Sequence, residues 1–285
     1  MVIVAGASAL AGGLGAWPVL ADVPAPVPVP VLAPGAEPDT QVPGKPGLDG
    51  RWVLGFTLGA SPSYSGASDR RTSLRPVLAG QIGRWTVSSS AAKRLTGAPL
   101  AGGISTTVMA SERWQLGLGL RVTQGRSSAD DGLFDGMPDV AASLAVRASA
   151  AYALTPDWRL TSGVQQDVLR SQGMRANVGL AWSRPLVSGW TLDASTGLTW
   201  ADARAMGTYY GVSTSQSRPG RPAWHPGAGL EQWHWGVGVS RALSTHWRVS
   251  ANAGRSTLVG QAARSPLTRR PSGSVIQVSL AYVRW

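Results

Sequence analysis

Residues 111–123 of the chain read SERWQLGLGLRVT, a short polar turn followed by a tryptophan and a strictly alternating run. Successive side chains of a β-strand point to opposite faces, so the apolar residues of this run would share one face. They are Trp114, Leu116, Leu118, Leu120 and Val122. The opposite face would carry Gln115, Gly117, Gly119, Arg121 and Thr123. The run therefore predicts a strand with one apolar and one polar face.

The same order of turn, tryptophan and alternating run recurs five times along the chain. The tryptophans that begin these runs are Trp85, Trp114, Trp158, Trp190 and Trp247. Tryptophan is amphipathic and favours the interface between membrane and water. A ring of tight turns, each followed by an interfacial tryptophan, is typical of the short-turn end of a transmembrane β-barrel. The sequence thus predicts an all-β fold, a transmembrane antiparallel up-and-down β-barrel.

Aromatic residues also mark the other strand ends. Trp200, Trp233 and Trp235 flank the longest expected connection, and Trp52 begins the first alternating run. Alternation alone also fits a soluble sandwich, but tryptophans at both ends of the strands fit the two aromatic belts of a barrel. We predict an interfacial belt made of Trp52, Trp85, Trp114, Trp158, Trp190, Trp247, Trp200, Trp233 and Trp235.

The five turns give the number of strands. Five tight turns join ten strands, and one further strand at each end of the barrel region gives twelve. Residues 86–104 form a poor lipid-facing surface, so we expect short third and fourth strands and keep ten strands as the alternative. Long connections are expected near 125–139 and 202–230, opposite the tight turns. An even strand number places both ends of the barrel, and the short turns, on the periplasmic side.

Composition supports a barrel and excludes other classes. Beyond the N-terminal stretch there is no run of ~20 apolar residues, which excludes a helical membrane bundle. The formal net charge is +11, and the only lysines are Lys45 and Lys93. The arginines are spread singly rather than along a basic helix or stripe, so nucleic acid is not an expected partner. The chain has no cysteine, which excludes disulfides and thiolate chemistry.

The first fifty residues differ from the rest. Residues 1–21 are apolar and end in Val19-Leu20-Ala21, which indicates a signal peptide, although a basic start is missing. Residues 22–50 are rich in proline, valine, alanine and glycine, and we expect a semi-rigid periplasmic tether, a spacer or a docking peptide. The barrel is expected to span residues 51–285.

The candidates for chemistry in the barrel region are few. His234 would face the lumen three residues after Glu231, but one histidine and one carboxylate make neither a triad nor a three-ligand metal site. The spacing of Asp130, Asp131, Asp135 and Asp139 does not match a calcium-binding loop. No Gly-x-Ser-x-Gly motif occurs. We therefore expect no catalytic, cofactor-binding or metal site, and a protein that is not an enzyme.

The arginines allow two interpretations of the lumen. The residues expected to face inward are Arg51, Arg121, Arg147, Arg159, Arg175 and Arg248. They could line an anion-selective pore, or they could pair with Asp167, Asp193 and Gln165 and plug it. The loop arginines suit the phosphates of lipopolysaccharide. They are Arg70, Arg71, Arg126, Arg204, Arg218, Arg221, Arg269 and Arg270.

Three short segments resemble a known family. They are Ser61-Pro62-Ser63-Tyr64-Ser65-Gly66-Ala67, Tyr209-Tyr210-Gly211-Val212-Ser213 and Ser265-Pro266-Leu267. In order and spacing over residues 51–285 the chain is similar to the MipA/OmpV family, the MltA-interacting outer-membrane proteins. One departure lies at the C-terminus, where Tyr282 stands three residues before Trp285 rather than two. The extra residue changes the phase of the last strand.

The resemblance implies a location and partners. It implies a barrel of the cell outer membrane that contacts outer-membrane lipid and lipopolysaccharide and is inserted by the barrel-assembly machinery. It also implies a non-enzymatic scaffold that brings a murein hydrolase near a murein synthase on the periplasmic side. A passive or weakly anion-selective channel is the alternative. The tether, the tight turns and the strand ends would be the surfaces available to such partners.

Overall fold

The computed structural model describes residues 51–89, 102–123, 125–128, 131–170 and 172–284, so the expected signal peptide and tether lie outside the described residues. The strands are β1 Trp52–Pro62, β2 Arg70–Ile82, β3 Trp85–Ser88, β4 Gly103–Ala110, β5 Trp114–Thr123, β6 Ser143–Ala153, β7 Trp158–Asp167, β8 Met174–Pro185, β9 Trp190–Ala201, β10 Gly229–Ala242, β11 Trp247–Leu258 and β12 Ser272–Arg284. The α-helices of the described part are α2 Ala203–Tyr210 and α3 Gly260–Ala263. Short 3₁₀ turns are η3 Gly132–Phe134, η4 Val187–Gly189 and η5 Thr214–Gln216.

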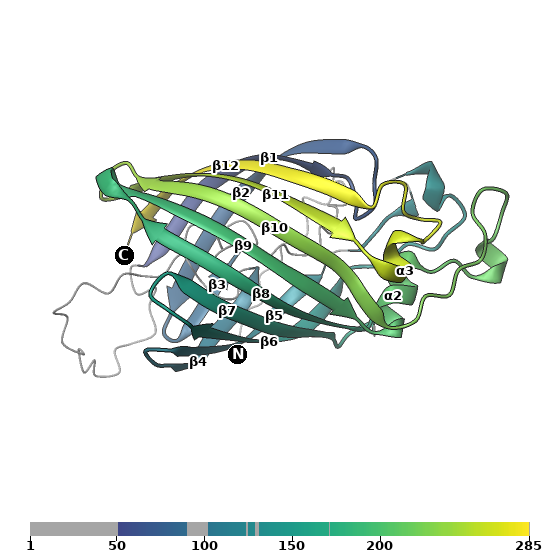
Figure 1. Cartoon of the computed structure of the whole chain (residues 1–285), viewed down its shortest axis with the longest axis horizontal. Coiled ribbons are helices and arrows are strands. Elements are labelled where there is room, and N and C mark those ends of the chain that lie inside the picture. Colours follow the sequence, from purple (N-terminus) through teal and green to yellow (C-terminus); the bar gives the residue numbers. More distant parts are fainter. Residues whose placement is uncertain (1–50, 90–101, 124, 129–130, 171, 285) are drawn as a thin grey trace, which may run out of the picture.

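The twelve strands form one closed antiparallel barrel in which each strand pairs with its sequence neighbours (Figure 1). The barrel closes where β1 pairs with β12, from Trp52 opposite Arg284 to Ala60 opposite Ile276. Closure pairs every strand on both sides and leaves no open sheet edge. The prediction of a twelve-stranded up-and-down barrel is therefore confirmed.

The two ends of the barrel differ, as predicted. The short turns expected on one rim contain Gly83, Glu112, Asp157, Gly189 and Thr245. The connections at the opposite end contain Gly66, Asp131, Gln172, Gln216 and Arg264. We call the first set of turns, with the strand ends beside them, the short-turn rim, and the second the long-loop end. Figure 1 shows α2, α3 and the long loops together at one end, far from the C-terminus.

Alternating side chains give the wall an apolar outside and a polar inside. In β5, Leu118 is 47% exposed on the outer face, whereas Gly117 beside it is buried. Inward positions elsewhere carry buried polar residues such as Thr57 of β1 and Ser279 of β12, whose hydroxyl groups lie 2.7 Å apart. An apolar outer band over a polar interior is the arrangement expected of a barrel in lipid.

The expected weak segment is short, as predicted. Strand β3 has 4 residues and β4 has 8, whereas β10 has 14. The expectation of a poor lipid-facing surface does not hold for β3 itself, because its outward residues are Trp85 and Val87, while Thr86 and Ser88 face the lumen. The connection that follows, 90–101, lies outside the described residues.

Strand β10 contains an irregularity that alternation does not predict. Leu230 pairs with Trp200 and Gln232 pairs with Thr199, so Glu231 is an additional residue between them. Such a bulge places two successive residues against one partner and redirects their side chains. As a result both Glu231 and Gln232 are buried, each 1% exposed.

The closing seam between β1 and β12 is reinforced on both faces. Inside, Val53, Val77, Ala281 and Val283 form a buried apolar cluster. Outside, the ring of Tyr282 stacks on Trp52 at 5.4 Å between centroids. Tyr282 therefore lies on the outer face, and Trp285, whose face the sequence left open, is outside the described residues.

The outer face gives a stability prediction. Leu118→Arg places a charge on the lipid-facing wall and should lower the free energy of unfolding by about 2–4 kcal/mol. Denaturant unfolding of the barrel in lipid vesicles, followed by tryptophan fluorescence, measures this change. Gly119→Arg is the contrasting variant, because a side chain there would meet the carbonyl oxygen of Ile104 at 2.9 Å on the inside. Unchanged stability of Leu118→Arg would mean that the two faces are reversed.

Candidate functional site

The long-loop end is a folded cap. Its apolar core is a buried cluster that draws on four different connections: the β1–β2, β5–β6, β9–β10 and β11–β12 loops. The members of this core are Tyr64, Ala67, Phe134, Met137, Val212 and Leu267. Loops that bury apolar side chains against one another are ordered by packing rather than only by their ends. We call these four loops with their buried core the cap.

The cap brings together the three segments that carry the family resemblance. Tyr64 of the first segment packs edge-on against Phe134, with the ring centroids 4.8 Å apart. The hydroxyl of Ser265 in the third segment donates a hydrogen bond of 2.7 Å to the carbonyl of Tyr210 in the second. The resemblance residues that lie in or beside the cap are Ser61, Pro62, Tyr64, Gly66, Tyr209, Tyr210, Gly211, Val212, Ser213, Ser265 and Pro266. Residues far apart in the sequence thus form one structural unit.

Two glycines of these segments are required by backbone geometry. Gly66 has a φ of +102°, a conformation that residues with a side chain rarely adopt, and a Cβ there would lie 3.2 Å from Thr268. A Cβ at Gly211 would lie 2.4 Å from the carbonyl oxygen of Gly207, at the end of α2. The glycines in these motifs therefore permit the loops to approach one another.

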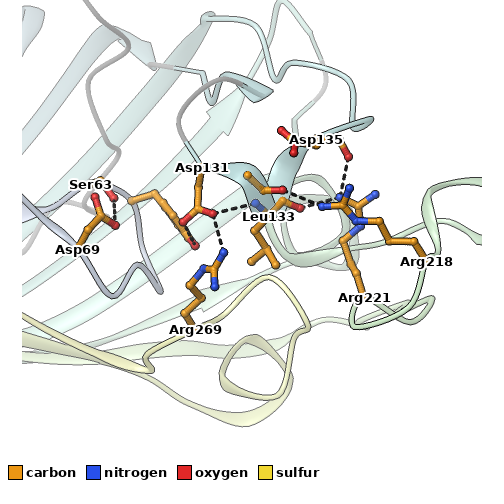
Figure 2. A network of polar contacts seen from close by, with 10 residues as sticks. Ser63, Asp69, Asp131, Leu133, Asp135, Arg218, Arg221 and Arg269 are labelled. Carbon is orange, nitrogen blue, oxygen red and sulfur yellow. Dashed lines mark hydrogen bonds and ion pairs between the residues drawn. The ribbon is translucent and has the colours of Figure 1, made fainter.

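A polar network crosses the cap around Asp131 (Figure 2). The Oδ1 atom of Asp131 accepts hydrogen bonds from Arg269 Nη2 and from the backbone N–H of Leu133, both at 2.8 Å. Its Oδ2 atom accepts from the hydroxyl of Tyr64 at 3.4 Å. Arg221 Nη1 donates to the carbonyls of Leu133 at 2.6 Å and Asp135 at 3.0 Å. These contacts join the β1–β2, β5–β6, β9–β10 and β11–β12 loops.

The charge states of the network follow from burial and neighbours. Burial, with the nearby Asp131 carboxylate, raises the pKa of Tyr64 to about 12, so its hydroxyl remains a donor at neutral pH. Burial alone would raise the pKa of Asp131, but hydrogen bonds from Arg269 and Leu133 and the charge of Arg269 lower it overall. Asp131 therefore stays ionised at neutral and mildly acidic pH. Its contribution to stability is lost only when the pH falls through this lowered pKa.

Beneath the cap, α2 packs onto the barrel. Asp202 caps the helix, because its Oδ1 atom accepts from the N–H of Ala205 at 2.7 Å. The helix buries Met206 and Tyr210 against the strand residues Ala201 and Leu258. The helix thereby fixes two tyrosines of the resemblance, Tyr209 and Tyr210, over the lumen.

An ion pair lies below these tyrosines inside the barrel. Arg175 Nε lies 2.8 Å from Glu231 Oε2, and Arg175 Nη2 lies 3.4 Å from Glu231 Oε1. The hydroxyl of Tyr210 donates to Glu231 Oε1 at 2.9 Å, and the Arg175 guanidinium lies 4.4 Å from the centre of the Tyr209 ring. Burial raises the pKa of Tyr210 well above its ordinary value, so it remains a donor. The partner of Arg175 is thus Glu231, which the bulge of β10 turns inward, and not Asp167, Asp193 or Gln165.

The remaining chemistry candidates have structural contacts in the described part of the chain. His234 is fully buried beside Gly197. Asp167 Oδ1 accepts from the backbone N–H groups of Arg170 and Gln172, and Asp139 Oδ1 accepts from that of Ser128. Among the described residues no three histidine, aspartate or glutamate side chains gather as metal ligands would.

The predicted belt tryptophans lie on the outer face. Trp85, Trp114, Trp158, Trp190 and Trp247 are the first residues of β3, β5, β7, β9 and β11. Trp52 begins β1, and Trp200, Trp233 and Trp235 lie on β9 and β10 near the long-loop end. Their contact with the membrane interface stays a prediction. Three further aromatics on the outer face were not predicted: Tyr152, Trp182 and Tyr282, which lie opposite Trp114, Trp158 and Trp247.

The short-turn rim is basic. Its exposed arginines are Arg51, Arg84, Arg113, Arg184, Arg248 and Arg284. Arg241 lies 5.2 Å from the ring of Trp190, and Arg84 lies 5.3 Å from that of Trp85. Glu112 and Asp157 are the acidic residues of its tight turns. The rim thus presents a predominantly positive surface.

The buried pair gives a prediction for the site. Arg175→Met would leave the carboxylate of Glu231 buried without its cation, which costs about 3–5 kcal/mol in comparable buried pairs. We expect that loss in denaturant unfolding of the barrel in lipid vesicles. The double variant Arg175→Met/Glu231→Met is the matched control and should recover most of the stability, since it leaves no buried charge. Equal stability of the single variant and the wild type would show that the ion pair does not stabilise the barrel.

Solved structures of low sequence identity resemble this barrel. Among the similar solved structures are the KdgM porin (9% identity, TM-score 0.40, covering 81% of this chain and 98% of that one) and an anion-selective porin from Comamonas acidovorans (10% identity, TM-score 0.40, covering 82% and 98%). A FadL homologue of Pseudomonas aeruginosa is also similar, at 11% identity and a TM-score of 0.38, with 81% of this chain and 90% of that one covered. No curated protein matches the chain.

One family accounts for nearly the whole barrel. None of the helices in the described residues is long and apolar enough to span a membrane. The model of the family described as "MltA-interacting protein MipA" matches residues 54–284, from the first strand to the last. The long-loop end of an outer-membrane barrel is extracellular and its short turns are periplasmic. The chain belongs to the MipA family and is a β-barrel of the outer membrane.

Proposed function

We propose that this barrel is a non-enzymatic scaffold that binds murein-remodelling enzymes at its periplasmic, short-turn rim. The observation that carries the proposal is the charge of that rim. Exposed arginines such as Arg84, Arg113 and Arg184 follow one another around it, with Glu112 and Asp157 as the acids of its turns. A ring of one sign attracts and orients a partner of the opposite sign. The family description, which refers to interaction with MltA, indicates the class of partner.

The size of the turns limits how a partner binds. Even a weak specific interface buries on the order of 1,000 Å². The turn between β2 and β3 consists of Gly83 and Arg84, and the turn between β4 and β5 of 111–113, so one turn alone is too small. A partner must therefore cover several neighbouring turns, or also bind the proposed tether, residues 22–50. A proline-rich tether would add contacts at low entropic cost, because proline-rich sequences favour extended conformations before they bind.

The arginines of the extracellular end differ from those of the rim, and this difference supports the rim as the binding surface. There the arginines of the cap donate mainly to the protein itself: Arg218 Nη2 to the carbonyl of Gly132 at 2.7 Å, and Arg126 Nη1 to that of Tyr209 at 3.1 Å. The rim arginines Arg51, Arg113 and Arg184 instead extend from turns or strand ends into the periplasm. We infer that the rim is the surface on which charge is available for a periplasmic protein partner.

Two alterations of the periplasmic surface test the scaffold. Deletion of residues 22–46 should weaken binding of purified MltA because it removes contact area. The variant Arg84→Glu/Arg113→Glu should weaken it by roughly tenfold or more, as expected when a charged contact is reversed. The reversal should also reduce the dependence of binding on salt. Surface plasmon resonance on the barrel in detergent measures both. Heat-modifiable migration on gels shows whether each variant is folded.

A matched reversal at the other end controls for net charge. Arg204→Glu/Arg264→Glu changes the total charge equally, but these exposed residues lie on the extracellular side. This control should bind MltA as wild type does. If the deletion and the rim reversal both bind like the control, the periplasmic surface is not the site of capture and the scaffold proposal fails.

A second candidate is a weakly anion-selective channel. It is favoured by arginines on the inner face of three successive strands: Arg121 of β5, Arg147 of β6 and Arg159 of β7. A lumen lined by cations selects anions. Against it, the lumen near α2 is occupied by the buried side chains of Glu231, Gln232 and His234, and of Tyr210 above them.

Conductance separates the two candidates. In planar bilayers we expect no stable single-channel steps from the wild-type barrel, because buried side chains occupy the lumen near α2 and the loops of the cap pack on one another at that end. The double variant Tyr210→Ala/Met206→Ala, which thins the packing of α2, is a positive control and should show more frequent openings. The channel would become the better supported function if the wild type showed regular conductance steps with an anion preference. That preference should then be smaller in Arg121→Gln/Arg147→Gln.

A further inference from the structure

One sector of the outer wall differs from the rest in its charge. In the extracellular halves of the described strands, the outward-facing arginines are Arg70 of β2 and Arg255 of β11. At the same level the other described strands carry apolar or uncharged residues on the outside, for example Val122 of β5 and Trp200 of β9. Two exposed cations therefore flank the four-strand sector β11–β12–β1–β2, which contains the closing seam.

The two arginines lie in one row of register partners across the sector. Arg255 pairs with Ser274 of β12, and Arg70 pairs with Pro62 of β1. Strands β12 and β1 are themselves neighbours. Neighbouring strands are about 4.8 Å apart, so the three spacings between β11 and β2 separate their backbones by roughly 14 Å. Arg270, which is also exposed, lies just before β12, where its N–H donates to the carbonyl of Gly66 at 2.9 Å. We call Arg70, Arg255 and Arg270 the wall arginines.

The guanidinium of Arg255 turns away from the hydrocarbon. Its Nη2 atom donates to the hydroxyl of Ser272 at 2.7 Å. Ser272 is the first residue of β12 and lies further toward the extracellular side than Ser274, which is opposite Arg255. Long cationic side chains at a membrane interface extend in this way toward the polar layer. Arg255 thus presents its charge at the level of lipid headgroups, whereas Arg70 Nη2 donates to the carbonyl of Ala60 at 3.5 Å, two residue pairs further into the wall.

Directly below them the wall is strongly apolar. Phe56, Leu58, Leu74 and Ile276 project outward from β1, β2 and β12 and are 55–62% exposed. A surface that combines cations at headgroup level with exposed apolar side chains beneath matches a lipid with an anionic head and several acyl chains. Asp69, the acidic residue next to Arg70 in the sequence, accepts a hydrogen bond from Ser63 at 2.7 Å.

The structure also separates these arginines from the others that the sequence offered as lipopolysaccharide ligands. Arg269 pairs with Asp131 inside the cap, and Arg218 and Arg221 donate to loop carbonyls. Their position is set by the cap rather than by lipid. Arg255, which the sequence did not single out, faces the membrane instead.

We propose that the sector β11–β12–β1–β2 is a binding site for a phosphorylated glycolipid of the outer leaflet, of the lipopolysaccharide class. Its phosphates would lie between the wall arginines, because a guanidinium and a phosphate form paired, charge-assisted hydrogen bonds. Its acyl chains would cover the side chains of Phe56, Leu58, Leu74 and Ile276. The site is independent of the periplasmic rim and of the partner proposed there.

Native mass spectrometry of the purified barrel in detergent, titrated with lipid A, tests the site. The wild type should retain bisphosphorylated lipid A, and Arg70→Gln/Arg255→Gln should bind it roughly tenfold or more weakly, since each charged hydrogen bond lost costs more than a neutral one. Dephosphorylated lipid A should bind the wild type no better than bisphosphorylated lipid A binds the variant. Free inorganic phosphate should not compete, because it lacks the acyl chains.

Charge and folding are controlled separately. Arg204→Gln/Arg264→Gln removes the same charge from exposed residues of two extracellular connections that are not in the proposed site, and should leave lipid A binding unchanged. Heat-modifiable migration shows that both double variants are folded. Equal binding of bisphosphorylated lipid A to wild type and Arg70→Gln/Arg255→Gln would overturn the proposal, as would equal retention of lipid A with and without phosphates. Competition by inorganic phosphate would replace the glycolipid site with a simple anion site.

Discussion

The backbone of a strand in hydrocarbon cannot leave its N–H and C=O groups unpaired, and the rest of this structure depends on that constraint. It requires the first strand to meet the last, which β1 and β12 do over nine residue pairs, from Trp52 to Ala60 on one side. Once the sheet is closed, every strand has one face toward lipid and one toward the lumen. The two ends of the barrel are then the places where the chain can vary freely.

The variation at the two ends follows different rules. At the periplasmic end the turns are too short to pack on one another, so their side chains extend into water. Charge is therefore the main property of that surface. At the extracellular end the loops are long enough to form a second core around Tyr64 and Phe134. The same residue type therefore has different roles: Arg113 is exposed on a turn, whereas Arg221 joins its own β9–β10 loop to two carbonyl groups of the β5–β6 loop.

Sequence reasoning predicted the features that are local. The alternation of apolar and polar residues identifies the outward face of β5. The tryptophan after each tight turn identifies where a strand begins, and the number and order of the strands follow from these positions. The bulge at Glu231 could not be predicted, because one additional residue at a strand end leaves the alternation from Trp233 onward unchanged. For that reason the partner of Arg175 was also missed. The cap was visible only as family-like segments, since contacts between loops such as that of Asp131 with Arg269 leave no periodic trace.

The cap has a consequence for the order of assembly. Asp131 and Arg269 are 138 positions apart in the sequence, and Tyr64 and Leu267 come from the first and the last extracellular loops. Contacts between residues so far apart form readily only once the chain between them has been brought together, and pairing of the barrel strands does this. The cap must therefore form late, after β12 has joined β1, and it can open without any wall hydrogen bond being broken. An intact cap is accordingly a sign that the barrel has closed.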